Sequence, residues 1–261
     1  MAASLPILTF HTLDDQSSNV SFSPQVFRRG MARLHKKGYR TITLPEAIYL
    51  LRQGRPFPER SLVITFDDGY QTVYEEAFPI LQRYNMSATV FLTVGEGGTT
   101  MAAGLLPSHK GHSMLSWHNI REMHQWGITF GAHTLTHPDL TRLPLDQTGS
   151  EIYDSKSIIE DALSASVTCF AYPYGRYNDR IRELVRQHFI CACSDKFGLV
   201  AARSDLYSLE RIDACYFRTD RLFGVILTGW FPSYIWARNI PLSVRRAFQR
   251  SPERRNDTRQ S

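Results

Sequence analysis

One run in the first third of the chain is apolar and then abruptly acidic: Leu62-Val63-Ile64-Thr65-Phe66-Asp67-Asp68-Gly69-Tyr70. Its first five residues are typical of a strand that is buried on both faces of a parallel sheet. The two carboxylates follow where the chain leaves the carboxyl end of that strand, which is where ligands and catalytic groups gather in barrels and open sheets. Neighbouring residues on an extended chain point in opposite directions, so Asp67 and Asp68 are expected to have different roles. The alternative is a solvated Asp-Asp-Gly turn.

Similar apolar runs alternate with amphipathic segments along most of the chain. Strands are predicted at residues 6–10, 39–43, 62–66, 88–92, 128–131, 168–171 and 190–193, and helices at 24–38, 45–52, 71–84, 116–126, 146–163 and 179–188. This alternation indicates an α/β fold with a parallel sheet covered on both faces, and about seven such units favour a barrel over an open sheet. Residues 94–114 lack periodicity and are expected to form a Gly-rich loop beside the site.

Composition and charge narrow the class of protein. Of the 261 residues, 43% are hydrophobic and 21% charged, as in ordinary soluble globular proteins. The net charge of +5 arises in residues 238–261, where seven Arg face two acidic residues. The rest of the chain is neutral, so no nucleic-acid partner is expected.

The cysteines and the N-terminal residues indicate in which cellular compartment the protein is expected. Four scattered cysteines, Cys169, Cys191, Cys193 and Cys215, are predicted to be buried thiols in a reducing compartment, with Cys191 and Cys193 on one face of a strand. No segment approaches the roughly 18 apolar residues of a membrane-spanning helix, and the first residues do not resemble a signal peptide. A cytoplasmic location is therefore expected.

Three further motifs follow predicted strands. In Gly131-Ala132-His133-Thr134-Leu135-Thr136-His137, two imidazoles four residues apart on a helical turn would share a face and chelate one metal. Two imidazoles and one carboxylate with open positions are typical of a catalytic metal centre. Phe170-Ala171-Tyr172-Pro173-Tyr174-Gly175 is a turn that would offer a backbone N–H and aromatic walls, and His11 ends the first strand. Taken singly, each motif also fits a purely structural role.

Together these motifs resemble a known family. Thr65-Phe66-Asp67-Asp68-Gly69, His133-Thr134-x-x-His137 and Tyr172-Pro173-Tyr174-Gly175, in this order, are similar to the motifs of the polysaccharide deacetylases, carbohydrate esterase family 4 with its NodB-homology domain. Leu8-Thr9-Phe10-His11 resembles the branch typified by poly-N-acetylglucosamine deacetylases, in which the motif of the acid histidine is permuted to the front. The resemblance implies a distorted (β/α) barrel of about seven parallel strands and a divalent metal, zinc first, with cobalt, nickel, manganese or iron as alternatives.

The resemblance also implies the roles of individual residues. Asp68, His133 and His137 would hold the metal, Asp67 would be the general base and His11 the general acid. The backbone N–H of Tyr174 would help to form the oxyanion hole.

The third motif departs from the family. There an Arg often precedes the Pro-Tyr pair and contacts the base, but Phe170 and Ala171 stand in that place, and Arg211 in Leu209-Glu210-Arg211-Ile212-Asp213 is the candidate replacement. The residues predicted to bind substrate are Tyr70, Tyr172, Pro173 and Tyr174.

The expected function is metal-dependent removal of N-acetyl groups from a hexosamine-containing glycan or glycan precursor, which includes a lipid-linked one. Two alternatives stay open: a deformylase or small-molecule amidase on the same fold, and a catalytically inactive glycan- or membrane-binding module. A two-His-one-carboxylate iron oxygenase would need a β-sandwich, which the alternating pattern contradicts.

The C-terminal segment is predicted to be separate from the catalytic domain. Residues 1–220 are assigned to that domain and 221–261 to an extension, in part disordered, that is aromatic and then Arg-rich. Aromatic residues beside arginines suit the surface of an anionic bilayer, so one hypothesis is peripheral contact with the inner face of the membrane through residues 223–250. The alternatives are that the aromatic residues pack on the barrel, or that they bind a protein partner.

Overall fold

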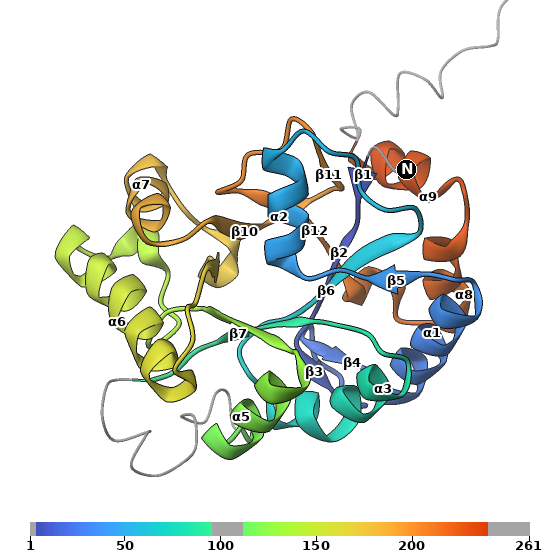
Figure 1. The fold of residues 1–261 in the computed structure, drawn as a ribbon, viewed down its shortest axis with the longest axis horizontal. Helices are drawn as coiled ribbons and strands as arrows, with labels where there is room; N and C mark the ends of the chain where they lie inside the picture. Colours follow the sequence, from blue (N-terminus) through green and yellow to red (C-terminus); the bar gives the residue numbers. More distant parts are fainter. Residues whose placement is uncertain (1–3, 96–111, 240–261) are drawn as a thin grey trace, which may run out of the picture.

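Seven parallel strands form a closed barrel in the part of the chain that the computed structural model describes, residues 4–95 and 112–239 (Figure 1). They are β2 (Ile7–Phe10), β6 (Ser61–Phe66), β7 (Thr89–Leu92), β8 (Thr129–Ala132), β9 (Cys169–Ala171), β10 (Cys191–Phe197) and β12 (Leu209–Asp213). Their order is β2-β12-β10-β9-β8-β7-β6, and β2 returns to pair with β6, with Ile7 opposite Val63. The predicted α/β barrel of about seven parallel strands is thus confirmed.

The strands of the ring differ from the predicted set in one place. Strand β5 (Arg40–Thr41), inside the predicted strand 39–43, pairs with β6 alone among the described strands and lies outside the ring. The ring instead includes β12, for which no strand was predicted. The sequence pattern hides β12 because Arg211, a charged residue, is buried in it beside Ile212.

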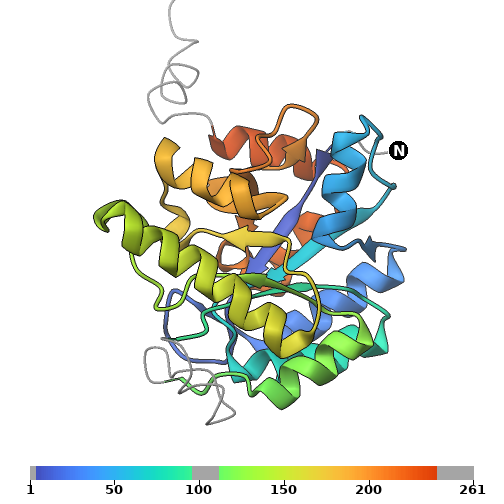
Figure 2. The ribbon, with the colours of Figure 1, turned by 60° about the vertical axis from the view of Figure 1, so that its left-hand side comes forward.

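Helices surround this barrel (Figures 1 and 2). They include α1 (Pro24–Lys36), α2 (Leu44–Arg52), α5 (Trp117–Trp126), α6 (Leu145–Leu163) and α7 (Asp179–His188). The predicted helix 71–84 is interrupted as expected at Pro79, where the π-helical turn η1 (Val73–Ala77) gives way to α3 (Phe78–Arg83). Proline is tolerated in the first turn of α3 because the N–H groups there have no partner within the helix.

Alternate strand residues belong to two different apolar clusters. Leu62 and Ile64 pack in the large cluster that includes the residues of the surrounding helices. Val63 and Cys193 belong to a second cluster that contains Ile48 of α2. A helix outside the barrel can contact inward-facing strand residues only at one of the two ends of the barrel. The polar pocket described below lies at the carboxyl end, and no α2 residue lines it. Helix α2 therefore closes the amino end of the barrel.

The cysteines lie largely in this inner cluster. Cys169, Cys191 and Cys193 are buried free thiols, and Cys191 and Cys193 share one face of β10 as predicted. Cys215 differs from the prediction, because it is only half-buried in the turn η4 (Ala214–Phe217). Most of the Gly-rich loop predicted at 94–114, residues 96–111, lies outside the described residues.

The described C-terminal elements are α8 (Asp220–Phe223), η5 (Gly224–Leu227) and α9 (Phe231–Asn239). Phe223, Ile226, Phe231 and Ile235 are buried in the main cluster. The Phe223 ring lies so close to Gly30 of α1 that a Cβ there would be 2.6 Å from it. Trp230 and Trp236 remain exposed.

The membrane hypothesis for this segment is not tested by the described residues. No helix within residues 4–95 and 112–239 has the length and apolar character needed to cross a membrane. Arg245, Arg246 and Arg250 lie outside the described residues.

Two short strand pairs complete the structure. Strands β1 (Ser4–Leu5) and β11 (Val200–Ala201) are antiparallel, and β3 (Thr12–Leu13) and β4 (Ser21–Phe22) are parallel. The second pair follows His11 directly and contributes Val20, at its edge, to the pocket lining.

Candidate active site

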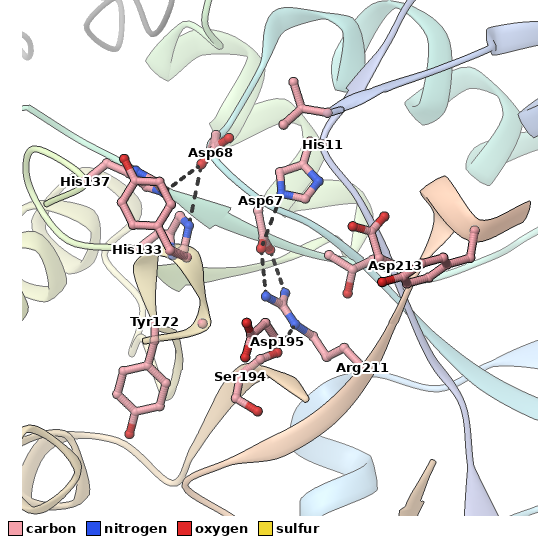
Figure 3. A pocket seen from close by; sticks show the side chains of 15 residues that line it. His11, Asp67, Asp68, His133, His137, Tyr172, Ser194, Asp195, Arg211 and Asp213 are labelled. Atoms are coloured by element: carbon pink, nitrogen blue, oxygen red, sulfur yellow. Dashed lines mark hydrogen bonds and ion pairs between the residues drawn. The ribbon is translucent and has the colours of Figure 1, made fainter. Parts of the chain in front are cut away.

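The carboxyl ends of the barrel strands surround a pocket of about 340 Å³. Most of the predicted site residues line it: His11, Asp67, Asp68, His133, His137, Tyr172, Tyr174 and Arg211. The structure does not place Tyr70 or Pro173 in this lining, and both are buried. The Tyr172 ring points away from the other labelled side chains in Figure 3, and its hydroxyl donates to the Tyr207 carbonyl at 3.0 Å.

Asp68, His133 and His137 form a buried group whose ligand atoms all lie within 4.8 Å of one another. Asp68 Oδ1 is 3.5 Å from His133 Nε2 and 3.4 Å from His137 Nε2 (Figure 3). Burial alone would raise the pKa of Asp68, but His133, His11 and His137 hold it far below its usual range, so Asp68 is a carboxylate.

Two observations show that this group fits a metal ion. Asp68 Oδ1 is buried and accepts no conventional hydrogen bond from the described residues. His133 Nδ1 lies 2.7 Å from the Ala171 carbonyl, which fixes the proton on Nδ1 and leaves the Nε2 lone pair for a ligand. A carboxylate and two imidazoles that leave coordination positions open suit a catalytic divalent metal.

The two histidines do not lie on a helical turn, and that part of the prediction is wrong. His133 follows β8 directly, and the chain then runs as a loop in which Thr134 and His137 have positive φ angles of 71° and 59°. The loop is stabilised from within, because Thr134 Oγ1 accepts the His137 N–H at 3.0 Å. It is also stabilised from α6, because Glu151 accepts the N–H of the two intervening residues at 2.8 and 2.9 Å. Pro138 disfavours helical conformation at His137.

Asp67 is paired with Arg211 through two parallel hydrogen bonds of 2.8 Å. A third hydrogen bond, from Arg211 Nε to the Ser194 carbonyl at 2.9 Å, fixes the guanidinium. Burial would raise the pKa of Asp67, but the Arg211 charge, with His133 and His11, keeps it below its usual value. The structure thus brings the arginine of β12 to the position in which the family pattern led us to expect one.

His11 and Tyr174 complete the predicted set. His11 Nε2 lies 3.9 Å from Asp67 Oδ2, with the Arg211 guanidinium on the other side of the carboxylate (Figure 3). Tyr174 has a positive φ of 57°, and its N–H donates no hydrogen bond to another residue of the described part. Its half-exposed ring meets His137 edge-on at 4.7 Å.

The pocket also contains residues to which the sequence analysis gave no role. They are Thr9, Val20, Gly175, Ser194, Asp195, Asp213 and Tyr216. Gly175 has a φ of 65° and approaches Asp195 so closely that a Cβ on it would be 2.3 Å from the Asp195 side chain. For Ser194 and Asp195 the sequence did offer a signal: the apolar start of β10 changes there to polar residues, as the chain does at Asp67 directly after β6.

The fold is thus a closed parallel barrel that carries, at the carboxyl end of its strands, a buried Asp-His-His group that could hold a metal ion. Residues 54–190 match the family model described as Polysaccharide deacetylase, and the chain belongs to this family, whose members are hydrolases acting on carbon–nitrogen bonds other than peptide bonds. The Bacillus subtilis (strain 168) protein YxkH, which carries the family name polysaccharide deacetylase, is 31% identical over 226 residues, covering 86% of this chain and 76% of YxkH. His11 and Arg211 lie outside the segment that matches the family model.

Other relatives extend this picture. The poly-beta-1,6-N-acetyl-D-glucosamine N-deacetylase of Staphylococcus aureus (strain MSSA476) is 30% identical over 179 residues. The matched part covers 65% of this chain and 59% of that relative. The structure of the Streptococcus pyogenes deacetylase PplD in complex with acetate superposes with a TM-score of 0.73 and 27% identity, over 82% of this chain and 93% of PplD. IcaB from Ammonifex degensii shares the fold, with a TM-score of 0.68 and 24% identity over 81% of this chain and 92% of IcaB.

Proposed function

We propose that the protein removes acetyl groups from N-acetylglucosamine residues of a glycan, with the β-1,6-linked polymer as the first substrate to test. The observation that carries the proposal is that one pocket combines the Asp68-His133-His137 group, the Asp67–Arg211 pair and His11. The Staphylococcus aureus relatives, which are named as poly-beta-1,6-N-acetyl-D-glucosamine N-deacetylases, support this choice of glycan.

Asp68, His133 and His137 would hold the metal, for which we propose zinc, with cobalt, nickel, manganese or iron as alternatives. When bound, such an ion would supply Lewis acidity, because it would lower the pKa of water toward neutrality and polarise the amide carbonyl. Asp68 contributes a permanent negative charge, and the hydrogen bond to Ala171 orients His133 for this role.

Asp67 would accept the proton of the attacking water. The two hydrogen bonds from Arg211 keep its carboxylate ionised at neutral pH and fix its orientation. His11 lies beside Asp67 and would donate a proton to the nitrogen of the leaving amine, which an amide needs before its C–N bond breaks. The available N–H of Tyr174 would donate a hydrogen bond to the oxygen on which negative charge develops.

Acetate release tests this proposal. Full-length protein is depleted of metal with a chelator, reloaded with zinc or cobalt, and assayed on a panel of N-acetylated hexosamine glycans with N-formylated analogues beside them. We expect acetate release only after reloading, and only from acetylated glycans. Formate release alone would favour the deformylase alternative, and release of neither acid from any compound would refute the proposal.

Three finer predictions rest on the sequence alone and remain proposals: a cytoplasmic location, a lipid-linked substrate, and membrane contact through residues 223–250. Co-sedimentation of the full chain with anionic vesicles at low salt tests the last of these. Protein that stays in the supernatant would contradict it.

A further inference from the structure

Tyr216 is an aromatic residue of the pocket that no proposed catalytic step uses. It lies in η4, directly after β12, and Asp213 begins this turn by accepting the Cys215 N–H at 2.8 Å. Ala214 and Phe217 are 3% and 0% exposed, whereas Tyr216 is 45% exposed and lines the pocket. The turn is therefore anchored on both sides of Tyr216 and leaves its ring available to a ligand.

The contacts of Tyr216 separate it from the reacting groups. Tyr174, the other half-exposed tyrosine of the pocket, contacts His137. The ring and cation contacts of Tyr216 are instead with Phe197 and Arg238. A sugar ring has apolar C–H faces and a polar edge, and tyrosine offers a large apolar ring with a hydroxyl at its tip. Tyr216 thus suits a sugar of the glycan other than the one that carries the reacting acetamide.

The ring is held in place by the C-terminal helix α9. Arg238 lies over it with its guanidinium carbon 4.7 Å from the ring centroid, and Arg238 Nη1 donates to the Tyr234 hydroxyl at 3.0 Å. Phe197 packs edge-on against Tyr216 at 5.1 Å. The next residue of α9, Asn239, donates to the Phe197 carbonyl at 2.8 Å. Because a cation is attracted to the face of an aromatic ring, Arg238 restrains Tyr216.

We infer that Tyr216 contacts a sugar next to the deacetylated residue, and that Arg238 is a positioning residue that acts through Tyr216. The inference rests on the proposed function, because it assumes a glycan substrate longer than one sugar. It gives the end of α9 a part in substrate selection.

The test compares kinetic constants on two substrates, a simple N-acetylglucosamine glycoside and longer β-1,6-linked N-acetylglucosamine oligomers, with zinc-loaded full-length protein. Tyr216→Ala should raise KM for the oligomers about fivefold to tenfold and leave kcat, metal content and KM for the glycoside unchanged. Tyr216→Phe keeps the ring and should stay near the wild type.

Arg238→Ala should raise the same KM about twofold to fivefold, and Arg238→Lys, which keeps the charge, should recover part of this loss. In a Tyr216→Ala background, Arg238→Ala should have no further effect if it acts through the ring. Matched controls are Tyr49→Ala on α2, a tyrosine at the closed end of the barrel that is 56% exposed against 45% for Tyr216, and Arg203→Ala on the surface. Both should match the wild type.

Two results for Tyr216→Ala would overturn the inference while the proposed function stands: an unchanged KM for the oligomers, or an equal rise in KM for the oligomers and for the glycoside. Additive effects of Tyr216→Ala and Arg238→Ala would overturn the role of Arg238. If the wild type releases no acetate at all, the proposed function fails, and calorimetric titration with the oligomers then decides the inference separately. In that titration, weaker binding by Tyr216→Ala supports it, and equal or absent binding overturns it.

Discussion

Replacement of Arg211 by Met should destabilise the protein strongly at neutral pH. The change removes both 2.8 Å hydrogen bonds to Asp67 and leaves a buried carboxylate, 3% exposed, without its cationic partner. Breaking a buried ion pair in this way costs about 3–5 kcal/mol, a large share of the 5–15 kcal/mol that a typical domain has.

The cost should depend on pH in a defined direction. In the wild type the pKa of Asp67 is lowered, so the pair contributes stability above the unfolded pKa of about 3.9, and this contribution is lost as the pH falls through the folded value. In Arg211→Met, the guanidinium no longer opposes the effect of burial, so the pKa of Asp67 should be higher than in the wild type. The carboxyl group then becomes protonated on mild acidification, and the difference from the wild type should shrink from pH 7 toward pH 4.

Urea unfolding followed by circular dichroism at several pH values measures both effects. The double variant Asp67→Asn/Arg211→Met serves as the control, because it removes both charges and should recover about 2 kcal/mol or more of the loss. A cost below about 1 kcal/mol at pH 7, or the same cost in the Asp67→Asn background, would refute the assignment of a coupled buried pair.

Three further experiments test the residues of the site. Asp68→Asn should lose bound metal in elemental analysis, whereas Asp67→Asn should retain it and lose turnover; equal metal loss in both would contradict separate roles. His11→Ala should abolish amide hydrolysis with metal content unchanged and should affect an activated ester less, because that leaving group needs no proton; undiminished amide turnover would exclude His11 as the acid. Gly175→Ala should lower the free energy of unfolding by about 1–3 kcal/mol and lower kcat, because Gly175 has a positive φ and Asp195 occupies the space of a Cβ. The control Gly149→Ala in α6 meets no atom within 4 Å and should stabilise the protein by about 0.5–1 kcal/mol in thermal unfolding. Similar effects of both changes would argue against the close approach at Gly175.

The barrel was predictable because most of its strands are largely apolar, as in β6, where all six residues are buried and four are apolar. Strand β12 was missed because Arg211 interrupts its apolar pattern, and the reason for that interruption lies across the barrel at Asp67. A strand with a buried charge can be predicted only when the partner of that charge is known. Conversely, β5 has a strand-like sequence but pairs on one side only, which no local pattern reveals.

The candidate site was predictable where a motif follows a strand directly, as with Asp67, Asp68 and His133. The conformation of His137 was not, because a four-residue spacing fits both a helical turn and the loop that Glu151 stabilises from α6. Tyr216 carried no signal at all. Its position depends on Arg238 of α9, a contact between segments that the sequence pattern assigned to different parts of the protein.

The positive φ angles at the site have a consequence for how the protein can change. Among the described residues, seven other than glycine have positive φ, and four of them are Asp68, Thr134, His137 and Tyr174. A left-handed backbone conformation costs a residue other than glycine roughly 1–2 kcal/mol, so the packing of the barrel must stabilise these four residues in a conformation that is unfavourable for them. Selection for stability alone would therefore favour glycine at these positions and remove the side chains of Asp68, His137 and Tyr174, which line the pocket. Variants of this barrel selected only for heat resistance should lose the site before they lose the fold.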